Sequence, residues 1–226
     1  MNKDVVIVGN TEFSRNMRYF LEQEDSKTGQ RWNVVAFSVD KKFITSDTFD
    51  ERPIVDLNLL PTLYPPDKYE TLIAIGSAQM GDVRQNLFSR VKTLGYKIIS
   101  YVHHTAFIAG NSSIGEGCII LPYVYIGPNC SIGNGVLLWD HVECGHDNQI
   151  GDYSTCSGNA VLGGNSVIGS HCYVGLAATI FNSAIVEDYA LIGACAHVRR
   201  KVSKSRVLVP PQSNTLKNVT SRDFKV

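Results

Sequence analysis

The chain contains 226 residues, and its 21 lysine and arginine residues balance its 21 aspartate and glutamate residues, so its formal net charge is zero. This balance argues against a binding surface for duplex nucleic acid or for an anionic membrane. No segment approaches the roughly 20 apolar residues that cross a bilayer, and the first residues lack the features of a signal peptide. We therefore expect a cytoplasmic protein whose partners are small molecules or copies of itself.

The first hundred or so residues alternate short apolar runs with helical segments. Apolar runs at residues 5–8, 34–39 and 71–75 predict strands, and residues 13–24 and 81–94 predict helices. Strands that alternate with helices form a parallel sheet, and such sheets bind ligands beyond the carboxyl ends of their strands. The sequence therefore predicts a small Rossmann-like α/β domain with a parallel sheet.

The turns after the three predicted strands carry the candidate substrate-binding residues. Gly9 and Asn10 follow the first strand, Asp40 and Lys41 the second, and Gly76 the third. A phosphate can bind at the helix N-terminus after Gly9, and Asp40 can accept a hydrogen bond from a base or a ribose. The turn lacks the complete Gly-x-Gly-x-x-Gly fingerprint of dinucleotide-binding proteins, so a turn glycine without a ligand is the alternative.

A six-residue period dominates the rest of the chain. An aliphatic residue or a cysteine occupies every sixth position through sixteen consecutive hexads, and glycine follows it in nine of them. The hexad positions are Ile108, Ile114, Ile120, Ile126, Ile132, Leu138, Cys144, Ile150, Cys156, Leu162, Ile168, Val174, Ile180, Val186, Ile192 and Val198. This period matches neither an α-helix, at about 3.6 residues, nor a strand, at about two. It predicts short strands joined by tight corners, with each inward side chain stacked on its counterpart one coil away.

The six cysteines follow the repeat instead of a metal-binding or disulfide pattern. None belongs to a Cys-x-x-Cys pair, and the spacing of metal ligands is absent. Five of them stand at inward positions of the hexads: Cys118, Cys130, Cys144, Cys156 and Cys172. We interpret these five as small buried hydrophobic residues, and we expect no metal.

The hexads resemble those of the hexapeptide transferases, and this resemblance implies a triangular left-handed parallel β-helix with three hexads in each coil. It also implies a homotrimer with active sites between neighbouring subunits. With the α/β domain in front and His103-His104-Thr105-Ala106 at the join, residues 4 to about 203 resemble the family of sialic-acid O-acetyltransferases and bacillosamine-pathway N-acetyltransferases. The proline of that family's His-Pro-Ala-like segment is lost here. The resemblance implies a nucleotide-sugar-binding domain at residues 1–102, a β-helix acyltransferase domain at 103–203 and a C-terminal extension at 204–226 that lies over the prism.

One segment of the repeat is unusually rich in charge. Ten of the ninety-six repeat residues are Asp, Glu, Lys or Arg, and four of the ten are Asp140, Glu143, Asp147 and Asp152. In the family that this chain resembles, the general base is a histidine followed by an acidic residue or a histidine and then, two residues later, by Ile-Gly, and His146 matches that placement. A neutral imidazole suits the task of taking a proton from an attacking amine or hydroxyl group, and Asp147 or Glu143 would select its tautomer. Gly164 follows His146 by eighteen residues, so with three hexads per coil it lies one level above.

Further site residues are implied by the resemblance. Acetyl-CoA is the expected donor, and the candidate coenzyme-binding residues are Thr155, Gly164, Leu176, Ala194, Arg199 and Lys201, of which Thr155 stands where the family often has a second histidine. Asp140 and His141 join the candidate substrate residues. His171 and His197 lack acidic neighbours in the sequence and are interpreted as solvated corner residues.

These features predict transfer of an acetyl group from acetyl-CoA to the amine of a nucleotide-linked amino sugar. O-acetylation of a sugar, as in the sialic-acid enzymes, is the alternative. The spacing of His141 and His146 also resembles a ligand pair of the γ-type carbonic anhydrases, but the sequence offers no third zinc ligand. A trimer that binds a nucleotide sugar without catalysis is the remaining hypothesis.

Overall fold

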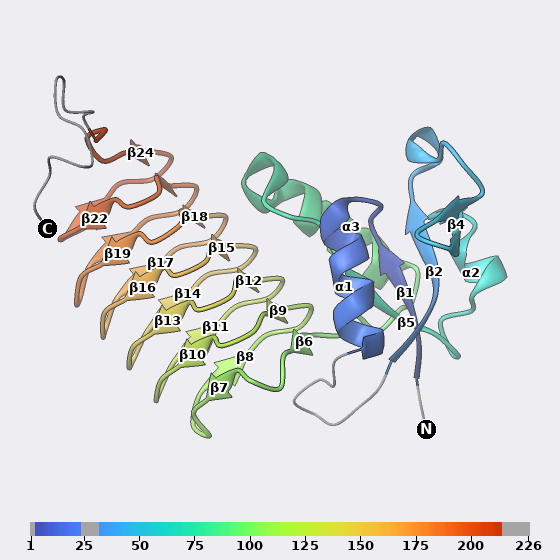
Figure 1. Cartoon of the computed structure of the whole chain (residues 1–226), viewed down its shortest axis with the longest axis horizontal. Coiled ribbons are helices and arrows are strands. Elements are labelled where there is room, and N and C mark those ends of the chain that lie inside the picture. The colour runs from blue at the N-terminus through green and yellow to red at the C-terminus, as the bar shows by residue number, and fades with distance from the viewer. Residues whose placement is uncertain (1–2, 24–31, 214–226) are drawn as a thin grey trace, which may run out of the picture.

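The computed structural model describes residues 3–23 and 32–213 and places an α/β region beside a long prism of stacked coils (Figure 1). Within the described residues, no helix is long and apolar enough to cross a membrane. The two expected regions are therefore both present, in the expected order. The part of the C-terminal extension at residues 214–226 lies outside the described residues.

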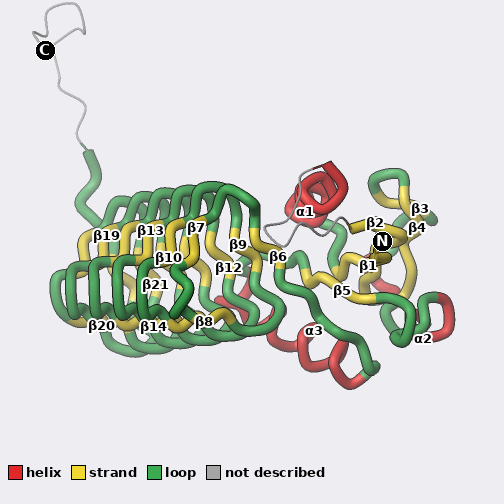
Figure 2. The backbone as a smooth tube through the Cα atoms, turned by 90° about the horizontal axis from the view of Figure 1, so that it is seen from below, coloured by secondary structure: helices red, strands yellow, loops and turns green. Residues whose placement is uncertain are grey.

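The front region is a five-stranded sheet with strand order β3-β4-β2-β1-β5. Its elements are β1 (Lys3–Val8), α1 (Glu12–Gln23), β2 (Trp32–Val39), η1 (Lys41–Phe43), β3 (Thr48–Phe49), β4 (Arg52–Asp56), α2 (Leu60–Leu63), β5 (Glu70–Ile73), η2 (Ala78–Gly81) and α3 (Asp82–Thr93). β1 pairs in parallel with β2 and with β5, as the sequence predicts. Helices α1 and α3 cover opposite sides of this sheet (Figure 2), so its apolar residues are buried on both faces.

The hairpin of β3 and β4 was not predicted from the sequence. Asp50 and Glu51 form its two-residue turn with φ values of 47° and 61°, a left-handed geometry that fits the twist of a tight hairpin. β4 extends the parallel sheet beside β2, whereas β3 pairs antiparallel with β4 at the edge. Neither residue of the turn is the glycine or asparagine that usually marks such a hairpin in a sequence.

The rest of the chain forms a parallel β-helix with three faces, which agrees with the left-handed β-helix that the resemblance to the hexapeptide transferases implies. Its strands are β6 (Tyr101–Val102), β7 (Phe107–Ile108), β8 (Ser113–Ile114), β9 (Ile119–Ile120), β10 (Tyr125–Ile126), β11 (Ser131–Ile132), β12 (Leu137–Leu138), β13 (Glu143–Cys144), β14 (Gln149–Ile150), β15 (Thr155–Cys156), β16 (Val161–Leu162), β17 (Val167–Ile168), β18 (Tyr173–Val174), β19 (Thr179–Ile180), β20 (Ile185–Val186), β21 (Leu191–Ile192), β22 (His197–Val198), β23 (Lys201–Val202) and β24 (Val207–Leu208). From β6 to β22 each strand pairs with the strand eighteen residues away, as Ile126 does with Cys144, so three hexads complete a coil. The last coil is shorter, because β20 pairs with β23 and β21 with β24 at a separation of sixteen residues.

We name the three faces by their strands. The first face contains β7, β10, β13, β16, β19 and β22, the second contains β8, β11, β14, β17, β20 and β23, and the third runs from β6 to β24. The third face extends past the predicted boundaries at both ends, because β6 pairs with β9 and β24 pairs with β21. Successive coils stack on one another along the prism in Figure 2.

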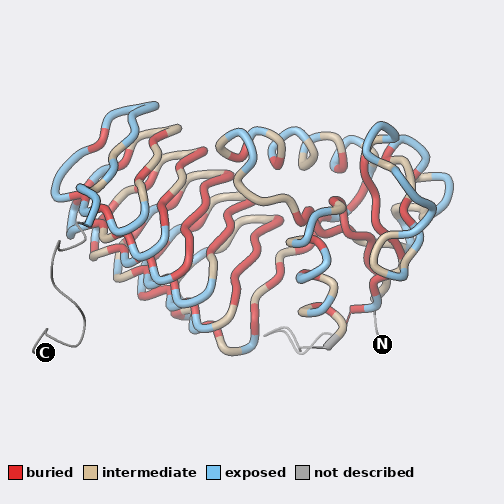
Figure 3. The backbone as a smooth tube through the Cα atoms, turned by 45° about the horizontal axis from the view of Figure 1, so that its top comes forward, coloured by how far each residue is buried: buried red, intermediate tan, exposed pale blue. Residues whose placement is uncertain are grey.

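The interior of the prism holds the predicted inward residues. Buried residues recur along every coil in Figure 3, and five of the six cysteines are buried there, whereas Cys195 is exposed. All six thiols are free, and burial raises the pKa of Cys118 and Cys156 to about 12. The interpretation of the inward cysteines as small core residues is confirmed, because a buried thiol with a raised pKa is a weak nucleophile and a weak metal ligand.

The front region rests on the third face. Ile119 and Leu137 point outward from β9 and β12, yet they are 3% and 2% exposed because they pack in one core cluster with residues of the front sheet and α1. Phe13 of α1 lies against Trp139, with ring centroids 5.1 Å apart. The first and second faces and the corner between them lie away from this contact (Figure 2).

Candidate active site

His146 and Asp147 occupy the corner between the first and second faces, where β13 ends and β14 begins; we call it the His146 corner. Asp147 has a φ of 56°, and its Oδ2 lies 2.7 Å from Nδ1 of His146. The hydrogen bond from His146 lowers the pKa of Asp147, and a hydrogen bond from Asn129 contributes as well. Because Nδ1 faces a carboxylate, the neutral imidazole carries its proton there and leaves Nε2 as an acceptor.

Gly164 lies against the imidazole from the next coil, where the eighteen-residue spacing places it. A methyl group on Gly164 would lie 2.4 Å from Nε2 and 2.6 Å from Cε1 of His146. No other residue type fits this position without displacing the ring. The His146 side chain is 59% exposed, so Nε2 can be reached by a ligand that passes over the glycine backbone.

The other charged residues of this segment lie elsewhere. Glu143 points outward from β13, and in the described part of the chain it makes no hydrogen bond or ion pair with His146. Asp140 and His141 lie at the preceding corner, between the third and first faces, where the His141 ring stacks on Tyr123 at 5.0 Å. The structure therefore brings together His146, Asp147 and Gly164 but not Glu143, Asp140 or His141.

The corner between the third and first faces, which we call the junction corner, borders a cavity of about 350 Å³ beneath the front region. Gly76 and Ser77 line it from the front sheet, and Asp140, Gly158 and Leu176 line it from the prism. Two candidate substrate residues and one candidate coenzyme residue thus share this cavity. Ala194 is exposed further along the same corner.

A second cavity, of about 440 Å³, lies beyond the carboxyl ends of β1, β2 and β5. Gly9, Asn10 and Asp40 line it as predicted, whereas Lys41 and Gly76 do not. The walls include apolar side chains, and the hydroxyl of Ser38 is fully buried without a hydrogen-bond partner among the described residues.

Arg90 also lines this cavity and was missed from the sequence. Its Nη2 donates to Oδ1 of Asp40 at 2.6 Å, and its Nη1 donates to Oδ2 at 3.1 Å. The Arg90 guanidinium holds the pKa of Asp40 below its usual range. The expected free carboxylate is therefore one half of an ion pair, and the fifty residues between the partners hid the contact from local sequence patterns.

A third cavity, of about 960 Å³, runs along the first face and the His146 corner in the C-terminal coils. Gly163, Phe181, Arg199 and Lys201 are among its lining residues, and Arg199 lies over the Phe181 ring at 5.9 Å. Lys201 Nζ is 2.6 Å from Glu187 Oε1. The predicted coenzyme residues therefore divide between two corners, with Arg199 and Lys201 on the side of His146 and with Leu176 and Ala194 at the junction corner.

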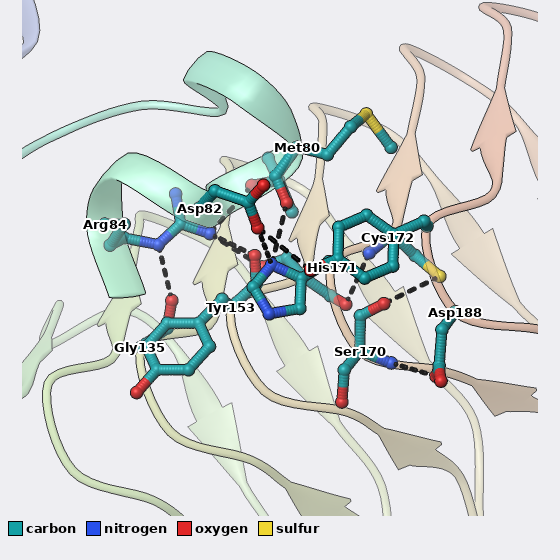
Figure 4. Close-up of polar contacts among 12 residues, drawn as sticks. Met80, Asp82, Arg84, Gly135, Tyr153, Ser170, His171, Cys172 and Asp188 are labelled. Carbon is teal, nitrogen blue, oxygen red and sulfur yellow. Dashed lines mark hydrogen bonds and ion pairs between the residues drawn. The ribbon is translucent and has the colours of Figure 1, made fainter. Parts of the chain in front are cut away.

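Thr155 has a structural contact, and its interpretation as a coenzyme residue is not supported. Its side chain is 2% exposed, and its hydroxyl accepts a hydrogen bond from Arg84 Nη2 at 3.1 Å. Arg84 also donates to the carbonyls of Gly135, Gly76 and Tyr153 at 2.7, 2.7 and 2.6 Å (Figure 4). This guanidinium is 2% exposed, and its burial lowers the pKa of Arg84 to about 10. Arg84, which the sequence did not single out, fixes the Gly76 turn to the prism.

His171 belongs to the same junction, so its interpretation as a solvated corner residue is wrong. It is 6% exposed, its Nδ1 lies 3.2 Å from Asp82 Oδ1, and its ring stacks on Tyr189 at 4.6 Å. Figure 4 shows this contact between the start of α3 and the corner that joins the second and third faces. Gly81 enters the contact with a φ of 91°, and a methyl group there would lie 2.4 Å from the Tyr153 carbonyl oxygen.

The described residues contain no group of three His, Cys, Asp or Glu side chains arranged to hold a metal ion. His141 and His146, the pair that suggested zinc, lie at different corners of the coil.

Known proteins share both the repeat and the fold. Residues 111–146 match the family model of the bacterial transferase hexapeptide (six repeats). The acetyltransferase domain of PglB from Neisseria gonorrhoeae FA1090 is 18% identical, with a TM-score of 0.79 over 92% of this chain and 97% of that one. WeeI from Acinetobacter baumannii AYE is 23% identical, with a TM-score of 0.76 over 92% and 97%.

A third similar structure was solved with its ligands. A histidine-to-alanine mutant of GDP-perosamine N-acetyl transferase from Caulobacter crescentus, in complex with CoA and GDP-perosamine, is 19% identical, with a TM-score of 0.79 over 92% of this chain and 93% of that one. At these identities the likeness establishes the shared two-part fold, an α/β region followed by a hexapeptide β-helix.

Proposed function

We propose that the protein is an acyltransferase that moves an acetyl group from acetyl-CoA to the amine of a nucleotide-linked amino sugar, with His146 as the general base. The observation that carries this proposal is the exposed His146–Asp147 pair, whose imidazole lies against Gly164. A side chain at Gly164 would block the approach to Nε2, and the glycine leaves that approach open for a thioester.

The residues of the His146 corner can perform the proton transfers of this reaction. As the amine attacks the thioester carbonyl, Nε2 accepts a proton from the nitrogen, and Asp147 stabilises the imidazolium that forms. When the tetrahedral intermediate collapses, the same proton passes to the departing thiolate of the coenzyme. The imidazole then returns to its neutral form, and an amide and a free thiol are released.

The ligand classes are proposed from the cavities and from the similar structures. The 440 Å³ cavity has apolar walls for a base and the Arg90–Asp40 pair among its lining residues for polar contacts. The solved transferase from Caulobacter crescentus holds CoA and GDP-perosamine, and the PglB domain from Neisseria gonorrhoeae FA1090 was solved with acetyl coenzyme A. We assign the nucleotide to this cavity and the coenzyme to the prism.

A homotrimer is part of the proposal, because one chain separates the parts of the site. The 350 Å³ cavity adjoins the third face and the 440 Å³ cavity lies within the front region, whereas His146 lies at the corner opposite that face. A neighbouring prism can bring its junction corner, with Asp140, Leu176 and Ala194, against the His146 corner. Light scattering on the purified protein tests the assembly, and a monomer that is fully active would contradict it.

The activity is tested with acetyl-CoA and a panel of UDP-, dTDP- and GDP-linked 4-amino sugars, with thiol release as the signal. His146→Asn is expected to reduce turnover by about 100-fold or more, the scale of a general base. His104→Asn, which replaces another exposed histidine away from the His146 corner, is the matched control. Near-normal turnover by a folded His146→Asn protein would refute the assignment, and activity on free sialic acid alone would favour O-acetylation.

A further inference from the structure

Asp147 receives a second hydrogen bond on the carboxylate oxygen that His146 does not use. Nδ2 of Asn129 donates to Asp147 Oδ1 at 3.1 Å, whereas Nδ1 of His146 lies 2.7 Å from Oδ2. Asn129 precedes Asp147 by eighteen residues and lies at the same corner one coil below. The two bonds together fix the rotation of the carboxylate, because each oxygen has its own donor.

A further asparagine determines which end of the Asn129 amide faces Asp147. Nδ2 of Asn111 donates to Oδ1 of Asn129 at 2.6 Å, and Oδ1 of Asn111 accepts from the Asn129 backbone N–H at 3.2 Å. The Asn129 oxygen is therefore engaged below, and its NH₂ group points up toward Asp147. An unbroken chain of side-chain hydrogen bonds runs from Asn111 through Asn129 and Asp147 to His146.

We propose that Asn129 is a positioning residue for the His146–Asp147 pair and that Asn111 sets the orientation of its amide. With Oδ1 held by Asn129, Oδ2 stays in line with Nδ1 of His146, so the imidazole keeps one tautomer and directs Nε2 toward the reacting atoms. Among the described residues, Asp147 is the charged partner of the His146 ring. The neighbours from the adjacent coils are uncharged: Gly164 lies against the ring, and Asn129 bonds to Asp147. This inference rests on the proposed role of His146.

Two substitutions at Asn129 test the role of its amide. Asn129 has a φ of 58°, a region that glycine adopts freely, so Asn129→Gly removes the side chain without straining the corner. We expect kcat to fall about tenfold with both KM values within about twofold, because orientation of the base is lost and substrate binding is not. Asn129→Asp keeps the shape but replaces the donor by a negative charge beside Asp147, and its loss of kcat is expected to be larger.

A spectroscopic signature separates this role from a merely structural one. In ¹⁵N NMR spectra of histidine-labelled protein, His146 is expected to show the Nδ1–H tautomer in the parent chain and a mixture of tautomers in Asn129→Gly. Ser183→Gly is the matched control, because Ser183 lies at the same corner with the same φ of 58°. Among the described residues, its side chain makes no hydrogen bond or ion pair with His146 or Asp147. It is expected to keep parental kcat and the parental tautomer.

Three outcomes would overturn the inference. Asn129→Gly and Asn129→Asp could both keep parental turnover and a single tautomer. Ser183→Gly could lose as much activity as Asn129→Gly, which would point to flexibility of the corner. Either result would leave the role of His146 intact. Conversely, if His146→Asn kept its turnover, the proposed function would fall and Asn129 would have no catalytic pair to position, whatever the tautomer spectra showed.

Discussion

The prism and the front region differ in how far apart in the sequence their essential contacts lie. In the prism the strands pair at a spacing of eighteen residues until the last coil, where the spacing is sixteen, so one repeated local rule builds nearly the whole prism. In the front region the decisive contacts join distant segments, such as Arg90 with Asp40 and Arg84 with Tyr153. The comparison shows that a periodic fold can be predicted from its sequence, whereas a junction built on single buried side chains cannot.

The largest expected effect tests that junction. Arg84→Met leaves the carbonyls of Gly135, Gly76 and Tyr153 without their donor, so we expect a loss of about 3 kcal/mol in the free energy of unfolding of the front region. Urea denaturation monitored by the fluorescence of Trp32 and Trp139 measures it. Arg200→Met, at an exposed corner, is the control and is expected to change stability by less than about 0.5 kcal/mol. If the Arg84→Met and Arg200→Met proteins were equally stable, the buried side chain of Arg84 would not be what holds the front region to the prism.

The second prediction tests whether the glycine at position 164 of the repeat is required for catalysis by His146. Gly164→Ala places a methyl group 2.4 Å from Nε2 of His146, so we expect turnover to fall about 100-fold through displacement of the imidazole. Gly110 lies at the same corner three coils earlier and has no atom within 4 Å of an added methyl group. Gly110→Ala is therefore expected to be silent in the thiol-release assay. A normal Gly164→Ala enzyme would mean that the reaction does not use this face of His146.

The third prediction concerns the interior of the prism. Cys144 is fully buried among apolar residues, and Cys144→Ser would bury a hydroxyl in their place at a cost of about 2 kcal/mol. Cys144→Val keeps the position apolar and is expected to cost less than about 1.5 kcal/mol. Thermal denaturation of both variants compares them. A stable serine variant would contradict the assignment of Cys144 as a core residue.

The smallest expected effect depends on pH. Since Arg90 lowers the pKa of Asp40 below its value in the unfolded chain, the pair stabilises the fold at pH values above that unfolded pKa. The stabilisation is lost as the pH falls through the lowered pKa of the folded state. A double-mutant cycle with Asp40→Asn and Arg90→Met is expected to show a coupling of about 1 kcal/mol at pH 7, and less at pH 3. A coupling that is unchanged at the acid pH would show that the ion pair does not contribute.

Much of the candidate site could be predicted from the sequence because it follows the repeat. The eighteen-residue spacing placed Gly164 over His146, and the strand ends placed Gly9 and Asp40 in one cavity. Thr155 and His171 make contacts that the sequence did not indicate, for one common reason. Their partners, Arg84 and Asp82, belong to the front region, and no local pattern connects segments more than seventy residues apart.

The sequence by itself determined the six-residue repeat, its short strands and its buried cysteines, because the same inward positions recur in each hexad, and the resemblance to a known family supplied the length of a coil. Only the tertiary structure decided that the front region covers the third face, that Arg84 is buried against carbonyl groups and that Asp40 is already paired. Those contacts depend on how two differently built regions approach each other. Single side chains settle that approach, and a single side chain leaves no periodic signal in a sequence.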